Sequence, residues 1–151
     1  MLNEWTAVHA IFIQPARNRD EMTRAADVAG RFAIMGIASM SADTAAVIGK
    51  LEEWGPRIGA DSGAPLMSGR VLYQGQGVEV GIWRCTPGGW AIADRPDTES
   101  VLILEGRARI TDATGESVEL TAGSALVLPA GWSGRWDILD TVVKHYVTIA
   151  R

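Results

Sequence analysis

The sequence predicts a mainly β domain, a sandwich or barrel, that follows an N-terminal helical extension. From Asp20 to Met40 apolar residues recur every three or four positions, which favours an amphipathic helix. From Arg70 onward they alternate with polar residues, and turns that contain glycine or proline divide this region into short strands. Such strands at this spacing are typical of a sandwich or barrel. We therefore expect an extension and loop over residues 1–65 and a β domain over residues 66–151.

The end of the extension carries signals for a second helix and a loop. Ser41 or Asp43 is a suitable cap for a helix over Thr44 to Trp54, which Gly55 and Pro56 would end. Glycines and prolines from Gly55 to Ser68 then predict a loop that leads into the sheet.

The β region predicts two hairpins followed by shorter strands. Arg70 to Gln74 and Val78 to Cys85 flank one glycine-containing turn, and Ser100 to Thr111 and Glu116 to Thr121 flank another. Further strands are predicted over Ala125 to Leu128, Gly134 to Leu139 and Thr141 to Ala150.

Composition excludes several classes of function. The 151 residues have a net charge of -4 and a pI near 5.1, so the chain offers no basic field for nucleic acid or anionic lipid. No apolar run reaches the roughly 18 residues that indicate a membrane span. A single cysteine, Cys85, excludes an intramolecular disulfide and suits a reducing compartment. We expect a cytoplasmic protein that binds neither nucleic acid nor membrane.

The glycine and proline spacing from Gly81 to Gly134 resembles the cupin family. Glu99-x6-Gly106 and Gly123-x5-Pro129-x-Gly131 match the skeletons of the two cupin motifs. The closest resemblance is to small single-domain cupins related to (S)-ureidoglycine aminohydrolase and to the ethanolamine-utilisation cupin domains. It rests on Gly81, Trp83, Pro87, Gly88, Glu99, Leu104, Glu105, Gly106, Pro129, Gly131, Gly134, Trp136, Lys144 and Tyr146. The resemblance implies the cupin double-stranded β-helix, a jelly-roll barrel, over residues 66–151.

The metal-binding residues of the family are missing. In metal-binding cupins a His-x-His pair precedes the glutamate of the first motif, and a further histidine ends the second. Here Ile92, Ala93, Asp94 and Arg95 precede the glutamate, and Gly134 ends the second motif. Glu99 remains as a ligand, with Asp94 as a possible second oxygen donor, and two carboxylates beside an arginine make a poor transition-metal site. We expect no metal and no cofactor.

The two histidines of the chain do not replace this site. His9 lies in the extension, and His145 lies in the last strand between Lys144 and Tyr146. A single histidine on a strand is more often a structural residue than a metal ligand.

Without a metal, a buried Glu99 needs another partner. We hypothesise that a Glu99–Lys144 pair takes the place of the metal centre, with Arg95 as a further partner. Strict alternation points the other way, because Val143, Val147 and Ile149 make the odd-numbered face of the last strand the more apolar one and direct Lys144 outward. A bulge near Gly106 would keep Glu99 on the inner face. Two surface charges are the competing interpretation.

Aromatic residues complete the candidate site. Trp83, Trp90, Trp132 and Trp136 fall within the motifs, where their rings could stack on a ligand or simply fill the core, the more common role. Cys85 has no base in view and is expected to be a buried, unreactive thiol. The predicted ligand-binding residues are Glu99, Lys144, Tyr146, Trp83, Trp136 and Arg95.

Three functions follow as alternatives. The first is a metal-independent cupin that binds a small polar metabolite in its barrel. The second, implied by the resemblance to ureidoglycine aminohydrolase, is a metal-dependent enzyme on a small nitrogenous or sugar-like metabolite. The third is a structural dimerisation module whose cavity is filled by side chains. In each case we expect a homodimer, since sheet faces and edges need cover.

Overall fold

The computed structural model of the chain describes residues 43–151. The helix predicted over residues 20–40, His9 and the alternative cap Ser41 lie outside the described residues, and the domain boundary at residue 66 stays a prediction. Asp43 is the cap of the first described helix, because its Oδ1 accepts hydrogen bonds from the amides of Ala45 and Ala46.

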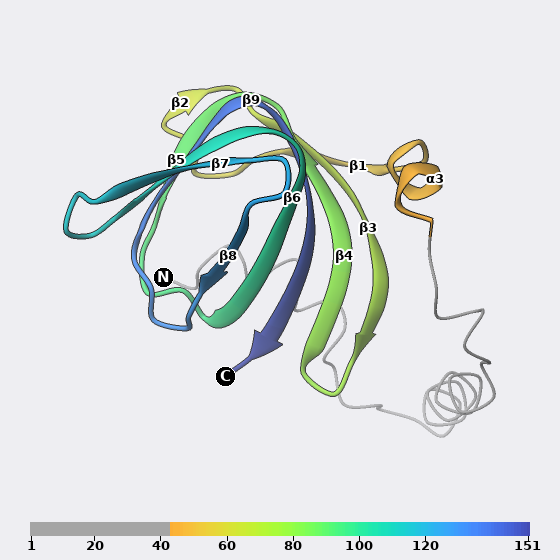
Figure 1. Cartoon of the computed structure of the whole chain (residues 1–151). Helices are drawn as coiled ribbons and strands as arrows, with labels where there is room; N and C mark the ends of the chain where they lie inside the picture. Colours follow the sequence, from red (N-terminus) through yellow and green to blue (C-terminus); the bar gives the residue numbers. More distant parts are fainter. Residues whose placement is uncertain (1–42) are drawn as a thin grey trace. The chain divides into compact units, whose positions relative to one another are not determined.

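The described residues form a curled antiparallel sheet after one short helix (Figure 1). The elements are α3 (Thr44–Ile48), β1 (Glu52–Pro56), β2 (Ser62–Gly63), β3 (Leu66–Gly75), β4 (Val78–Cys85), β5 (Gly88–Ile92), β6 (Asp97–Asp112), β7 (Ser117–Thr121), β8 (Ala125–Leu128) and β9 (Gly134–Ala150). With five residues, α3 is much too short to cross a membrane, and the described part of the chain holds no helix that could.

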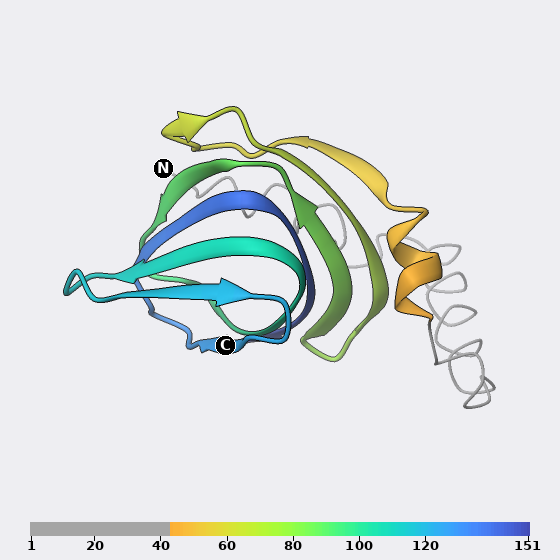
Figure 2. The ribbon, with the colours of Figure 1, turned by 45° about the horizontal axis from the view of Figure 1, so that its top comes forward.

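Two long strands hold the barrel together. β6 and β9 pair with each other from Asp97↔Ala150 to Asp112↔Gly134, so both bend around the interior that Figure 2 shows from above. β4 and β5 pair with opposite ends of β9, and β7 and β8 pair with opposite ends of β6. The mainly β jelly roll predicted from the sequence is confirmed, including both hairpins and the strand Ala125–Leu128.

The helix predicted over Thr44 to Trp54 is wrong beyond Ile48. Gly49 ends α3, and Glu52–Pro56 forms β1, which pairs with β3. The ring of Trp54 lies against the backbone of Gly69, in the space that a Cβ atom would fill. Pairing and packing with a distant strand therefore override the local helical pattern.

Two further boundaries differ from the prediction. The expected loop from Gly55 to Ser68 contains β2 and the start of β3. The two strands predicted on either side of Asp140 are one continuous strand, β9.

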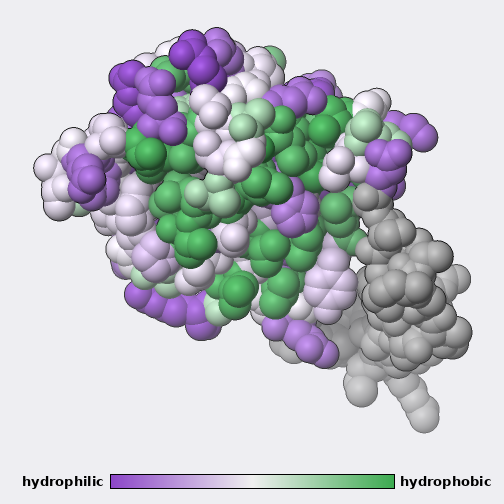
Figure 3. All heavy atoms as spheres, in the orientation of Figure 1, coloured by the Kyte–Doolittle hydropathy of each residue, from purple (hydrophilic) through white to green (hydrophobic). Residues whose placement is uncertain are grey.

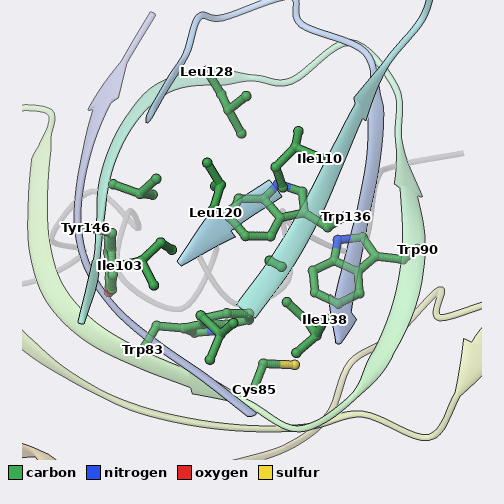
Figure 4. Packing of buried hydrophobic residues seen from close by; sticks show 13 residues of the cluster. Trp83, Cys85, Trp90, Ile103, Ile110, Leu120, Leu128, Trp136, Ile138 and Tyr146 are labelled. Atoms are coloured by element: carbon green, nitrogen blue, oxygen red, sulfur yellow. The ribbon is translucent and has the colours of Figure 1, made fainter. Parts of the chain in front are cut away.

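The interior of the barrel is a hydrophobic core that contains three tryptophan rings (Figure 4). Its buried members are Trp83, Cys85, Trp90, Val101, Ile103, Ala108, Ile110, Leu120, Leu128, Trp136, Ile138, Val142 and Tyr146. Trp90 is stacked on Trp136 with ring centroids 6.5 Å apart, and meets Trp83 edge to face at 6.3 Å. These three tryptophans are buried in the core, whereas Trp132 is only partly buried and packs against it.

Candidate functional site

The side chain of Glu99 faces the barrel interior because β6 is bulged. In its first half the odd-numbered residues Glu99, Val101 and Ile103 are buried, and in its second half the even-numbered Ala108 and Ile110 are buried. The pairing of β6 with β9 shifts register between Ile103 and Arg107. Gly106 lies within this bulge with a φ of 82°, a conformation that favours glycine. The bulge expected near Gly106 is therefore present.

Lys144 also faces the interior, so the outward direction predicted from strict alternation is wrong. On β9 the even-numbered residues Val142 and Tyr146 belong to the core cluster, and Lys144 lies over the core rings of Trp83 and Trp136. Val143 on the odd-numbered face is also buried, but it is not a member of that cluster. The alternation misled because the outer face of this sheet is itself rich in apolar residues.

Three charged side chains meet inside the barrel. The Lys144 ammonium donates a hydrogen bond to Glu99 Oε1 at 2.7 Å, and Arg95 Nη1 lies 3.0 Å from Glu99 Oε2. The exposed fractions of Lys144, Glu99 and Arg95 are 7%, 5% and 4%, so all three groups are removed from water. The predicted Glu99–Lys144 pair is present, and Arg95 engages the second carboxylate oxygen.

Aromatic rings enclose the ammonium. Lys144 Nζ lies 4.6 Å from the ring centroid of Trp83 and 4.7 Å from that of Trp136, within the range of a cation–π contact. Burial lowers the pKa of Lys144, whereas the charge and hydrogen bond of Glu99 act in the opposite direction. The carboxylate and the two rings thus offset part of the cost of desolvating the ammonium.

Asp97 adds a fourth charge that the sequence analysis did not single out. Its Oδ1 lies 2.9 Å from Arg95 Nε, the distance of an ion pair. The angles are unsuitable for a hydrogen bond, so both buried atoms lack a hydrogen-bond partner among the described residues. A hydrogen bond requires alignment as well as distance. The site therefore holds an unsatisfied donor next to an unsatisfied acceptor.

The hydroxyl of Tyr146 bonds to a residue outside the charged cluster. Its hydroxyl donates a hydrogen bond to Glu79 Oε1 at 2.8 Å, and burial, followed by the Glu79 charge, raises the pKa of the phenol. Glu79 was not predicted as a site residue; the signal was its position on β4, two residues before Gly81, which pairs with Tyr146. The ring of Tyr146 lies where a Cβ atom of Gly81 would be.

Cys85 is fully buried, as expected, and desolvation raises the pKa of its thiol to about 11. A thiol with such a pKa is almost entirely protonated at neutral pH and is a poor nucleophile.

The donor set does not fit a divalent metal. Both oxygens of Glu99 are engaged by cationic side chains, and Asp94, considered as a second ligand, is an exposed residue. Within residues 43–151, no three His, Cys, Asp or Glu side chains are grouped so that they could hold a metal ion. A divalent ion next to Glu99 would also be repelled by the charges of Arg95 and Lys144.

Comparison with known proteins identifies the fold. Residues 72–146 match the family model of the EutQ-like cupin domain. A Pseudomonas syringae protein of unknown function superposes with a TM-score of 0.61 at 20% identity over 65% of this chain and 43% of its own. Clostridium difficile EutQ gives a TM-score of 0.51 at 16% identity, over 57% of this chain and 69% of EutQ.

Ectoine synthase from P. lautus is also similar, with a TM-score of 0.51 at 19% identity over 56% of this chain and 64% of that protein. No curated protein matches the sequence. The chain spans less than half of the length of the Pseudomonas protein. At such identities the structural likeness concerns the fold alone.

Proposed function

The chain carries a small cupin domain, and from that premise we propose that it binds a small polar metabolite in its barrel without a metal. The ligand would meet the cluster of Arg95, Asp97, Glu99 and Lys144, with Trp83, Trp136 and Tyr146 around it. We also propose the cytoplasm as the location, because a chain with a single cysteine suits a reducing compartment.

One observation carries this proposal: Arg95 Nε and Asp97 Oδ1 are buried and form an ion pair at 2.9 Å, but neither atom makes a hydrogen bond. A buried polar atom that makes no hydrogen bond costs about 1 to 3 kcal/mol. A ligand hydroxyl can accept a hydrogen bond from the guanidinium and donate one to the carboxylate. A small hydroxylated or amide-bearing metabolite would therefore satisfy both atoms.

The charges next to this position favour a polar ligand. Replacement of a buried ion pair by apolar residues is often neutral or stabilising, so the Glu99–Lys144 pair alone is weak support for a role in stability. Its presence in the barrel together with Arg95 suits a recognition site whose hydrogen-bonding groups are held rigid. The alternative of a metal-dependent enzyme draws no support from this donor set.

A thermal-shift screen with matched variants tests the proposal. We expect a member of a set of small polyols, amides and hydroxy acids to raise the Tm of the protein by several degrees at saturation, since binding to the folded state stabilises it. Asp97→Asn should remove most of that shift. The control is Asp140→Asn, which neutralises an exposed carboxylate that pairs with Arg107 on the surface. The proposal fails if no compound raises the Tm, or if the shift survives in Asp97→Asn.

A second candidate function, dimerisation, is favoured by the outer face of the sheet. Register places Tyr73, Val80, Val147, Ser100 and Val127 in one row across β3, β4, β9, β6 and β8. The row contains no charged side chain, and Tyr73 and Val127 are 41% and 59% exposed. Apolar residues gather on this side of the domain in Figure 3. Two copies of such a row can meet without burying like charges.

Light scattering on the full chain tests this second function. Val127→Lys should convert a dimer into a monomer because it places a charge in the row. Val118→Lys, a control on β7 outside the row, should leave the dimer unchanged. A wild-type protein that is monomeric at high micromolar concentration would rule this function out.

A further inference from the structure

A groove opens into the barrel between β7 and β8. Among the described strands each of these two pairs only with β6, β7 near its end and β8 near its start. The groove between them has a volume of about 210 Å³. It is lined by Ile110, Asp112, Glu116, Ser117, Val118, Leu126, Val127, Leu128 and Trp132.

The floor of the groove is apolar. Ile110 and Leu128 belong to the buried core, as Figure 4 shows, and Leu126 and Trp132 pack against it. Val118 is two residues from the buried Leu120 on the same side of β7, yet it is 48% exposed. An inward-facing valine is thus left open to solvent, where burial by a ligand would be favourable.

The rim of the groove is acidic. Asp112 and Glu116 line it, and no lysine or arginine does. Asp112 Oδ1 accepts hydrogen bonds from the Thr114 hydroxyl and from the amides of Thr114 and Glu116, which fixes the turn between β6 and β7. The bonds from Thr114 come first among the causes that lower the pKa of Asp112, so this carboxylate is ionised at neutral pH.

We propose that this groove is a separate binding site for a small organic amine with an apolar body. The ammonium would lie beside the carboxylates of Asp112 and Glu116, and the body would cover Val118, Leu128 and Trp132. The volume is below the roughly 300 Å³ at which drug-sized pockets begin, so the ligand is limited to about one ring with a short chain. The indole of Trp132 adds a surface that attracts cations.

This site does not depend on the function proposed above. The two sites are neighbours, because Leu128 in the floor of the groove is paired with Glu99 across β6 and β8. The groove is lined by none of the residues of the charged cluster. Loss of ligand binding at the cluster would leave the groove as it is.

Titration of the full chain with three matched probes tests the proposal. The probes are 2-phenylethylamine, the neutral 2-phenylethanol and the anionic 3-phenylpropionate, followed by NMR at the amides of Ser117 and Val118 and at the indole N–H of Trp132. We expect the amine to shift these signals and to bind best, the alcohol to bind more weakly, and the anion to leave the signals unchanged. A higher salt concentration should weaken the binding of the amine, because exposed charges are screened.

Matched variants locate the charge that matters. Glu116→Gln should lower the affinity for the amine by about two- to fivefold, which is the contribution expected of an exposed ion pair. Glu119→Gln removes a charge nearby that pairs with Arg109 and does not line the groove, and it should have no effect. The proposal is overturned if the three probes bind alike, if the amine leaves the groove signals unchanged, or if Asp97→Asn removes its binding.

Discussion

Lys144 donates to Glu99 across 2.7 Å inside the barrel, although the residues around Lys144 make the opposite face of its strand rich in apolar side chains. Both groups are buried, and Arg95 takes the other oxygen of the carboxylate. The pair lies among the tryptophan rings of the core, in contact with Trp83 and Trp136. Charged side chains of the chain itself thus surround Glu99, the glutamate of the first cupin motif that faces the interior.

Removal of the ammonium should destabilise the fold. In Lys144→Met the carboxylate loses the donor to Oε1, and breaking one partner of a buried pair costs about 3 to 5 kcal/mol. The double variant Lys144→Met with Glu99→Gln should be more stable than the single one. In the single variant two buried carboxylates face one guanidinium, whereas in the double variant the charges of Arg95 and Asp97 balance each other. Urea unfolding measures both. Lys50→Met, at the other lysine of the chain and on an exposed residue, is the control with a change within about 0.5 kcal/mol. Equal stability of Lys144→Met and wild type would refute the buried pair.

Alkaline pH should destabilise the protein through Cys85. The pKa of this thiol is raised from 9.0 to about 11, so the stability it contributes below pH 9.0 is lost as the pH rises toward about 11. The unfolded thiol ionises in this window while the folded one stays protonated, which lowers the free energy of unfolding by up to about 2 to 3 kcal/mol.

Comparison of wild type with Cys85→Ala isolates the contribution of the thiol to the pH dependence of the free energy of unfolding. Burial lowers the pKa of Lys144, which gives a slope of opposite sign that both proteins share. In urea unfolding from about pH 8 to about pH 10.5, the free energy of unfolding should therefore fall more steeply with pH in wild type than in Cys85→Ala. Parallel curves would mean that the thiol is not buried in the folded state.

Gly106 should tolerate no side chain. Its φ is 82°, and an added Cβ atom would collide with the backbone carbonyl of Thr141. Gly115 has a similar φ of 90° but open space around it, so Gly115→Ala carries only the backbone cost of about 1 to 2 kcal/mol. We expect Gly106→Ala to cost distinctly more in urea unfolding. Similar losses in the two variants would argue against the bulge that turns Glu99 inward.

Divalent metal ions should have little effect on the protein. Arg95 and Lys144 already engage both oxygens of Glu99, so Mn²⁺, Ni²⁺ or Zn²⁺ would have to displace two cations. We expect addition of these ions or of a chelator to leave the Tm unchanged within about 1 °C. Purification without chelator followed by elemental analysis checks the same point, and a stoichiometric transition metal would contradict it.

The sequence predicted most of the barrel because its turns are local signals. The hairpin turns at residues 75–77 and 112–115 and the strand Ala125–Leu128 need no knowledge of distant partners. β1 was missed for the opposite reason: Trp54 is held in a strand by Gly69, which lies in a different part of the chain. Residues with strong local helical spacing can still be taken into a sheet by such long-range contacts.

The candidate site was predicted in part. Motif positions identified Glu99, Arg95 and Lys144, and a bulge near Gly106 was foreseen as the means of turning Glu99 inward. The direction of Lys144 could not be deduced, since both faces of β9 carry apolar residues. Asp97 escaped notice because it belongs to no motif position, although it lies only two residues from Arg95. The Tyr146–Glu79 bond escaped notice because it depends on the register between β4 and β9.

The most direct test of the buried pair is NMR of the two lysine side chains, Lys50 and Lys144, in protein labelled with ¹⁵N and ¹³C at lysine. The account predicts that Lys144 gives ammonium and Cε signals shifted by the rings of Trp83 and Trp136, slow in hydrogen exchange, and displaced in Glu99→Gln. Lys50 should keep the signals of a solvated lysine throughout. Two lysines with the same solvated signals, unchanged in Glu99→Gln, would contradict the central claim that an internal ion pair lies at the heart of this barrel.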